Sequence, residues 1–211
     1  MNILAVILAA GFSKRMGENK LLLKYKGKTF IQTIIDKLLE INFSKIILVV
    51  SNLEIYKKYE KYNEKVTVIF NDKAENGISE SIKKAVTHAE NNLNIDRYMF
   101  FVADQPLLKK ETILKIIEKS SSHKITVPKS NNTMYNPVIF PNKYNSELLS
   151  LEGDKGGKQI ISKNLDNITF VNIEDENEFQ DVDVIEEYLK LINERKLWNL
   201  ILMKNIMIMF L

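Results

Sequence analysis

The feature that most constrains the fold is a continuous apolar run, Ile3 to Leu8, which passes directly into the small residues 9–11. Unbroken apolar residues are typical of a strand buried on both faces of a parallel sheet. We therefore expect this strand near the centre of a sheet. Backbone N–H groups of small residues can approach an anion closely, and Arg15 and Lys20 follow in the chain. The turn after the strand thus suits a polyphosphate.

This turn differs from two common nucleotide-binding patterns. A Walker loop needs Gly-x-x-x-x-Gly-Lys-Ser/Thr, and the dinucleotide fingerprint needs Gly-x-Gly-x-x-Gly. Only Gly11 and Gly17 are present here, so neither pattern is met.

Strand and helix patterns alternate along the chain, which predicts the β-α-β-α-β unit of a doubly wound α/β fold. Thr29 is expected to cap a helix that ends near Ile41. The segment from Tyr135 to Pro141 is bounded by prolines and suits a sheet edge. The other expected strands are Ile46–Val50, Val66–Phe70, Tyr98–Ala103, Ile125–Pro128 and Ile168–Ile173, and the other expected helices are Ile55–Tyr62, one that opens at residues 76–81, Lys110–Glu118, Tyr144–Leu151 and Val184–Glu194.

Asp104 is the best metal candidate in the chain. It follows the strand Tyr98–Ala103, and the carboxyl ends of parallel strands border the crevice where doubly wound sheets bind ligands. Mg²⁺ usually takes one or two carboxylates plus substrate phosphates, so a single Asp at a strand end is chemically adequate. The alternative is that Asp104 caps the following helix.

Composition indicates a folded protein without a nucleic-acid or thiolate-metal site. The 211 residues include 30 Lys and Arg against 27 Asp and Glu, scattered along the chain, and no Cys. One domain is expected over residues 1–195, and a cytoplasmic location is the default. The apolar tail, residues 196–211, would form a helix too short for a bilayer core of roughly 30 Å. It could dock on the domain, form a dimer contact, or be the translation product of a shifted reading frame.

The residues Leu-Ala-Ala-Gly-x-Ser-x-Arg-Met-Gly-x-x-Lys-x-Leu-Leu resemble the signature of the molybdenum-cofactor guanylyl- and cytidylyltransferases. These MobA-like enzymes belong to the nucleotidyltransferases with a Rossmann-like fold. The resemblance implies a three-layer α/β/α fold with a mostly parallel mixed sheet. It also implies a nucleotide-binding half, about residues 1–105, and an acceptor-binding half, about residues 106–195.

The resemblance assigns residues to the nucleotide. Arg15, Lys20 and Asp104 would be catalytic, with the two cations neutralising the phosphates. A Gly-x-Ser-x-Ser segment would lie against the base and ribose. The residues expected to bind the nucleotide are Leu8, Ala9, Ala10, Gly11, Ser13, Arg15, Lys20, Gly77, Ser79 and Ser81. Ordinary helix capping by Ser79 is the alternative for the serines.

Three later segments resemble the acceptor and metal elements of the family. Tyr135-Asn-Pro137 resembles the segment that receives the acceptor, and 153–158 resembles the Gly-Asp-x-Gly-Ala-Arg element of the cytidylyltransferases. The second metal ligand would be Asp181 or Asp183; Asp181 is favoured, with Asp183 as a helix cap. The residues expected to bind the acceptor are Asn136, Pro137, Gly153, Asp154, Gly156 and Lys158.

The implied reaction is Mg²⁺-dependent transfer of CMP from CTP to the phosphate of molybdopterin carrying its metal. The product, molybdopterin cytosine dinucleotide, would pass to a molybdenum hydroxylase. Ala10 and Gln105 favour the cytidylyl branch by resemblance, and the Ala10 methyl leaves less room for a purine. The alternatives are a guanylyltransferase of this family, a sugar- or alditol-phosphate nucleotidyltransferase, and a non-catalytic nucleotide-binding module.

Overall fold

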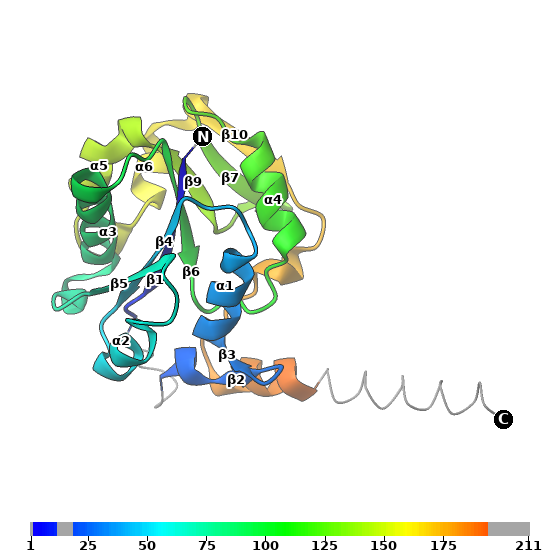
Figure 1. Cartoon of the computed structure of the whole chain (residues 1–211). Coiled ribbons are helices and arrows are strands. Elements are labelled where there is room, and N and C mark those ends of the chain that lie inside the picture. The colour runs from blue at the N-terminus through cyan, green and yellow to red at the C-terminus, as the bar shows by residue number, and fades with distance from the viewer. Residues whose placement is uncertain (1, 12–18, 194–211) are drawn as a thin grey trace.

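The computed structural model describes residues 2–11 and 19–193. They form three layers, with one mixed sheet between two layers of helices (Figure 1). The strands follow the order β10-β7-β9-β6-β1-β4-β5, with β8 paired to β7. Their bounds are β1 Ile3–Ala9, β4 Lys45–Val50, β5 Val66–Phe70, β6 Arg97–Val102, β7 Ile125–Ser130, β8 Thr133–Met134, β9 Val138–Pro141 and β10 Ile168–Asn172. The mostly parallel α/β fold predicted from the sequence is confirmed.

The expected central strand is β1, which runs parallel to β4 and β6 on its two sides. Alternate side chains of β1 enter two apolar cores. Ile3, Ala5 and Ile7 pack in the core with α1, α2 and α4, whereas Leu4 and Val6 pack in the core with α3, α5 and α6. Burial on both faces explains why this strand is an unbroken apolar run.

Helices cover both faces of the sheet, with α3 and α5 on one side and α1 and α4 on the other (Figure 1). Thr29 caps α1 as expected, because its hydroxyl accepts a hydrogen bond from the Gln32 N–H. The bounds are α1 Phe30–Leu39, α2 Leu53–Tyr59, α3 Ile78–Asn92, α4 Lys110–Lys119, α5 Asn145–Leu149 and α6 Lys158–Lys163, followed by a last helix over 185–193.

The expectation that the segment ending at Pro141 is an edge strand is wrong. β9 pairs antiparallel with both β6 and β7, so it lies inside the sheet, and β10 and β5 form the edges. The prolines are tolerated because Pro137 precedes the strand and Pro141 is its last residue, so the missing N–H groups fall at the ends of the ladder.

The sequence patterns did not reveal a short hairpin, β2 (Lys24–Tyr25) and β3 (Lys28–Thr29), which comes just before α1. Two-residue strands carry no detectable alternation. The turn residues Lys26 and Gly27 both have positive φ, which is the turn type that matches the twist of paired strands.

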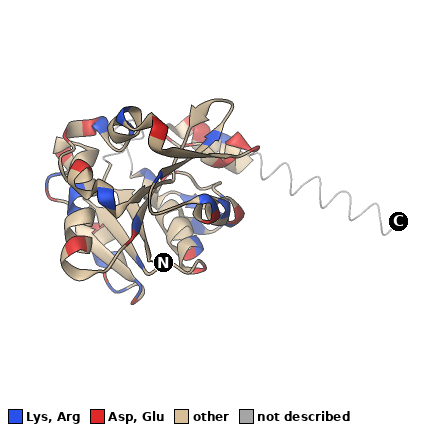
Figure 2. Cartoon of the chain, turned by 90° about the horizontal axis from the view of Figure 1, so that it is seen from above, with Lys and Arg blue, Asp and Glu red and all other residues tan. Residues whose placement is uncertain are grey.

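Basic and acidic residues are interspersed along the outer elements, as the blue and red segments of the ribbon in Figure 2 show. Within the described residues, no helix combines the length and apolar character that crossing a membrane would require. The predicted tail, 196–211, lies outside the described residues.

The start of α3 touches a distant loop through backbone atoms. Gly77 has φ +103°, and a Cβ there would lie 2.3 Å from the carbonyl carbon of Gly153 and 2.8 Å from the Asp154 nitrogen. The Asp154 carboxylate accepts a hydrogen bond of 3.2 Å from the Ile78 N–H. Gly77 is therefore required so that the two halves of the chain can meet.

We expect Gly77→Ala to lower the free energy of unfolding by about 1–3 kcal/mol, because the new Cβ meets backbone that cannot rotate away and the φ is strained. Urea unfolding measures the change. Gly11→Ala is the matched control, since nothing lies within 4 Å of its Cβ position. Equal stability of the two variants would contradict the contact with Gly153.

Candidate functional site

A cleft of about 430 Å³ opens at the carboxyl ends of β1 and β6. Leu8 pairs with Val102 across these parallel strands, so the turn at 9–11 and Asp104 emerge at the same edge of the sheet. The cleft is lined by Leu8, Ala9, Ala10, Gly11, Lys20, Leu21, Ala74, Gly77, Ile78, Ser81, Val102, Ala103, Asp104, Asp154 and Asp183. Most of the residues predicted to bind a nucleotide are thus brought together.

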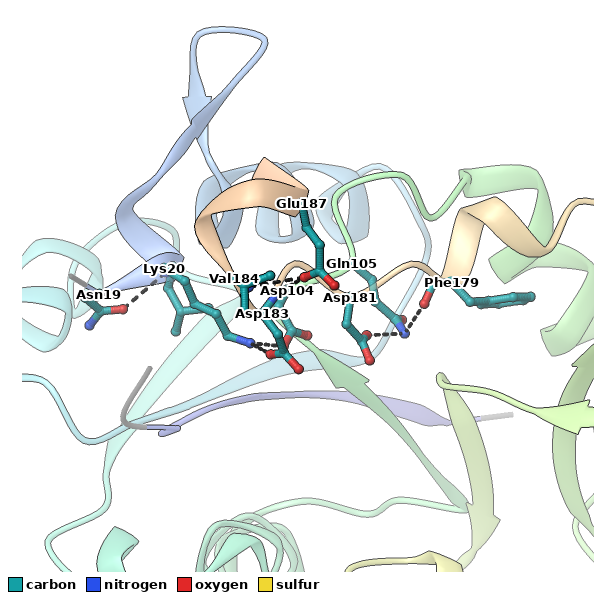
Figure 3. Close-up of polar contacts among 10 residues, drawn as sticks. Asn19, Lys20, Asp104, Gln105, Phe179, Asp181, Asp183, Val184 and Glu187 are labelled. Carbon is teal, nitrogen blue, oxygen red and sulfur yellow. Dashed lines mark hydrogen bonds and ion pairs between the residues drawn. The ribbon is translucent and has the colours of Figure 1, made fainter. Parts of the chain in front are cut away.

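Lys20 joins two carboxylates at the floor of this cleft (Figure 3). Its Nζ lies 2.5 Å from Asp104 Oδ2 and 2.6 Å from Asp183 Oδ1. Lys20 begins a single 3-10 turn, Lys20–Leu22, whose N-terminus is capped by the Asn19 side chain. Burial alone would lower the pKa of Lys20, but the charges of Asp104 and Asp183 outweigh it and raise this pKa. Lys20 is therefore a fixed cation.

Asp183 has a different place from the one predicted. The sequence predicted that Asp183 caps the last helix, but its carboxylate forms an ion pair with Lys20. The backbone N–H groups of Asp183 and Val184 instead donate to the Glu187 carboxylate, at 2.6 and 3.1 Å. Asp183 lines the first cleft, whereas Asp181 lines a second cavity.

The acidic side chains here are suited to a cation. Asp104 Oδ1 is buried and has no hydrogen-bond partner among the described residues, which leaves a carboxylate oxygen free to coordinate. Burial and the neighbouring charges of Asp104 and Asp183 raise the pKa of Asp181 to about 6, so a further positive charge would stabilise its ionised form. Two carboxylates plus phosphate oxygens fit the ligand set that Mg²⁺ prefers.

The second cavity, about 420 Å³, lies beside the first and shares Leu8, Ile78, Val102 and Asp154 with it. Its floor is largely apolar and includes Phe100, Val127, Val138 and Phe140. The residues predicted to bind the acceptor that line it are Asn136, Asp154, Gly156 and Lys158, and its lining also includes Gln105, Tyr135, Lys155 and Asp181.

Two residues assigned to the acceptor are not part of this lining. Pro137 follows Asn136 through a cis peptide bond and introduces β9. Gly153 meets Gly77 by its backbone. These two positions shape the chain around the cavity.

The serines of α3 differ from each other. Ser81 lines the first cleft and is held by a 2.9 Å hydrogen bond from the Asn71 amide. Ser79 is fully buried and does not line the first cleft, and its hydroxyl has no hydrogen-bond partner among the described residues. The expectation that it caps α3 is wrong, because Gly77 is the N-cap residue. Ser13 and Arg15 lie outside the described residues.

Sequence reasoning missed the structural role of Gln105 and the apolar floor of the second cavity. The side-chain amide of Gln105 donates to the Phe179 carbonyl and to Asp181, rather than facing the first cleft. The floor comes from strands whose apolar residues are indistinguishable in sequence from ordinary core. The only sequence signal for the role of Gln105 was its position directly after Asp104.

Comparison with known proteins identifies the family of this site. The family model described as "MobA-like NTP transferase domain" matches residues 5–168. The chain belongs to the MobA-like NTP transferase family. It is therefore a nucleotidyltransferase by family, as the sequence signature indicated.

Two relatives and two solved structures extend this comparison over most of the chain. The purine catabolism protein PucB of Bacillus subtilis is 26% identical over 88% of this chain and 94% of its own length. A probable molybdenum cofactor guanylyltransferase of Pyrococcus horikoshii is 28% identical over 82% and 88%. Rv0371c of Mycobacterium tuberculosis has the same fold, with a TM-score of 0.80 at 23% identity over 92% and 98%. A manganese complex of Rv0371c is also similar, with a TM-score of 0.75 at 21% identity over 92% and 99%.

The arrangement in this MobA-like chain can bring two anionic substrates together. A phosphate chain in the first cleft would meet small backbone at 9–11 and the cation Lys20. A group in the second cavity would lie across the shared wall from it. Positioning and charge neutralisation can accelerate phosphoryl-type transfer without a covalent intermediate.

We expect Asp181→Asn to stabilise the protein at pH 8, by about 1 kcal/mol because solvent screens the charge interactions of this partly exposed side chain, and by little at pH 4, without added metal. The pKa of Asp181 in the folded chain, about 6, exceeds the ordinary unfolded value, so the folded state binds more protons and loses stability as pH rises from about 4 through 6. Urea unfolding at both pH values measures this.

Asp166→Asn, at an exposed position, is the control and should show no such pH dependence. If Asp181→Asn destabilises the chain at pH 8, the carboxylate is not held in an acidic, partly buried environment.

Proposed function

We propose that the protein transfers CMP from CTP to the phosphate of a molybdopterin-type acceptor that carries its metal, and releases pyrophosphate. The proposal rests on one observation above all. Two adjoining cavities share a wall, one with Lys20, Asp104 and the small-residue turn, the other with Asn136, Gly156 and Lys158. Such a pair of cavities suits a nucleotide and a second phosphate-bearing substrate.

In the proposed reaction, an oxygen of the acceptor phosphate attacks the α-phosphorus of CTP. A new P–O bond forms, and the bond from this phosphorus to the oxygen that bridges to the β-phosphate breaks. Pyrophosphate leaves with that oxygen. The acceptor phosphate is already an anion at neutral pH, so the reaction needs no enzyme nucleophile.

The chain's residues would hold the reactants and neutralise charge. Lys20 would stabilise negative charge on the phosphates, and the sequence signature adds Arg15, which lies outside the described residues. Asp104 and Asp181 would hold Mg²⁺. A bound Mg²⁺ would supply Lewis-acid chemistry to the phosphates. The free Asp104 Oδ1 supports this assignment.

The character of the second cavity favours an acceptor with an apolar or aromatic body. Phe100, Phe140 and Val127 line its floor, whereas a sugar or alditol phosphate would need a lining rich in hydrogen-bonding groups. Lys155 and Lys158 are available for the acceptor phosphate. This supports the molybdopterin-type acceptor over the polyol alternative, and a molybdenum hydroxylase in the cytoplasm remains the proposed recipient of the product.

Ala10 supports CTP as the donor. It is buried and lines the first cleft. Its methyl group would leave less room beside the bound base than a glycine would, which favours a pyrimidine over a purine. GTP is the competing donor, because the relative from Pyrococcus horikoshii is named a guanylyltransferase.

We expect pyrophosphate release when the chain is mixed with Mg²⁺, CTP and molybdenum-loaded molybdopterin, with GTP used less efficiently. Lys20→Ala should lower turnover by about 100-fold or more, because it removes a cation aimed at the developing charge. Lys57→Ala, at an exposed position on α2, is the control and should retain turnover. Coupled detection of pyrophosphate measures both.

Each of three outcomes would contradict a different part of the proposal. No pyrophosphate with any acceptor would exclude the proposed transfer. Preference for GTP would exclude the cytidylyl assignment. Undiminished turnover of Lys20→Ala would remove Lys20 from the phosphate site.

A further inference from the structure

Gln105 lies next to the two carboxylates assigned to the metal and makes contacts that no part of the proposed reaction explains. It follows Asp104 directly, is only 6% exposed and borders the second cavity. Its Nε2 donates two hydrogen bonds, 3.1 Å to the Phe179 carbonyl and 2.9 Å to Asp181 Oδ1 (Figure 3). Both hydrogens of the amide nitrogen are thus directed at the segment that carries Asp181.

Other contacts fix the backbone of that segment. The Val182 N–H donates to the Asp104 carbonyl at 3.1 Å. The rings of Tyr135 and Phe179 stack with centroids 4.6 Å apart. These contacts hold the chain beside the end of β6, but they do not set the direction in which the Asp181 carboxylate points. The hydrogen bond from Gln105 does that.

The chemistry of the amide suits this task. A carboxylate on a short side chain can rotate, and a donor on Oδ1 selects one orientation and leaves Oδ2 for another partner. A neutral amide does so without adding a positive charge that would compete with a metal ion. In metal sites generally, partners that hydrogen-bond a ligating carboxylate orient it and tune its affinity.

We infer that Gln105 is a positioning residue that orients Asp181 for binding a divalent cation together with Asp104. The inference rests on the proposed function, which assigns these two carboxylates to the metal. It adds a residue to which the proposed reaction assigns no role. Gln105 would act through Asp181 rather than by reading the base.

The test measures Mn²⁺ affinity directly. The full chain is titrated with Mn²⁺ in the presence of the non-reacting analogue α,β-methylene-CTP, and free Mn²⁺ is followed by electron paramagnetic resonance. We expect Gln105→Met, similar in length but without donors, to weaken Mn²⁺ binding by about 10- to 100-fold. Gln105→Asn, which shortens the side chain, should act in the same direction and serves if the Met variant does not fold.

A second readout separates positioning from a merely structural role. Excess Mg²⁺ should restore the turnover of Gln105→Met, because Asp181 is still present. A structural defect would lower the unfolding temperature and would not be rescued by metal. The matched control is Gln180→Met, at an exposed position in the same segment, which should bind Mn²⁺ within twofold of the parent chain.

Retained Mn²⁺ affinity in both Gln105 variants would overturn the inference. Unchanged Mn²⁺ affinity in Asp181→Asn would overturn it as well. The Mn²⁺ affinity of Asp104→Asn would then show whether any metal site remains at the end of β6. Failure of the proposed function looks different: Mn²⁺ binding would depend on Gln105 as expected, but no CMP would reach a molybdopterin-type acceptor.

Discussion

The site depends on the ion pair that Lys20 makes with Asp104 and Asp183. These three residues come from the turn region after β1, the end of β6 and the segment before the last helix, and they meet only when the sheet is formed. The side chains of Lys20 and Asp104 are 13% and 17% exposed. Removing one partner of a pair so poorly solvated leaves an uncompensated charge, at a cost of about 3–5 kcal/mol for fully buried pairs. The pair therefore ties fold stability to the geometry of the cleft.

Topology then places the second cavity beside the first. β6 supplies Asp104 at its carboxyl end and Phe100 within it, so one strand contributes to both cavities. β9 enters the sheet antiparallel next to β6 and brings Val138 and Phe140 to the floor. The contact between Gly77 and Gly153 closes the shared wall, and Asp154 borders both cavities. A MobA-like chain thereby holds two adjoining cavities on a single sheet.

The sequence predicted well those features that local chemistry determines. Apolar runs such as Ile3–Leu8 indicate burial on both faces, and Asp104 after a strand indicates the edge of the sheet where the first cleft opens. Features that depend on distant partners were not predictable. The interior position of β9 is set by pairing with β6 and β7, and the need for Gly77 arises from backbone in the other half of the chain. The role of Asp183 was not predictable either, because its carboxylate pairs with the distant Lys20 rather than with the helix that follows it.

The most direct test of this account is a crystal structure of the chain with Mn²⁺ and a non-reacting CTP analogue. We expect the triphosphate over residues 9–11, Lys20 within hydrogen-bonding distance of a phosphate oxygen, and an anomalous manganese peak at coordination distance from Asp104 and Asp181. The second cavity should remain open to solvent. A nucleotide seated on the Phe100 and Phe140 floor, or manganese bound away from both aspartates, would contradict the assignment of the two cavities.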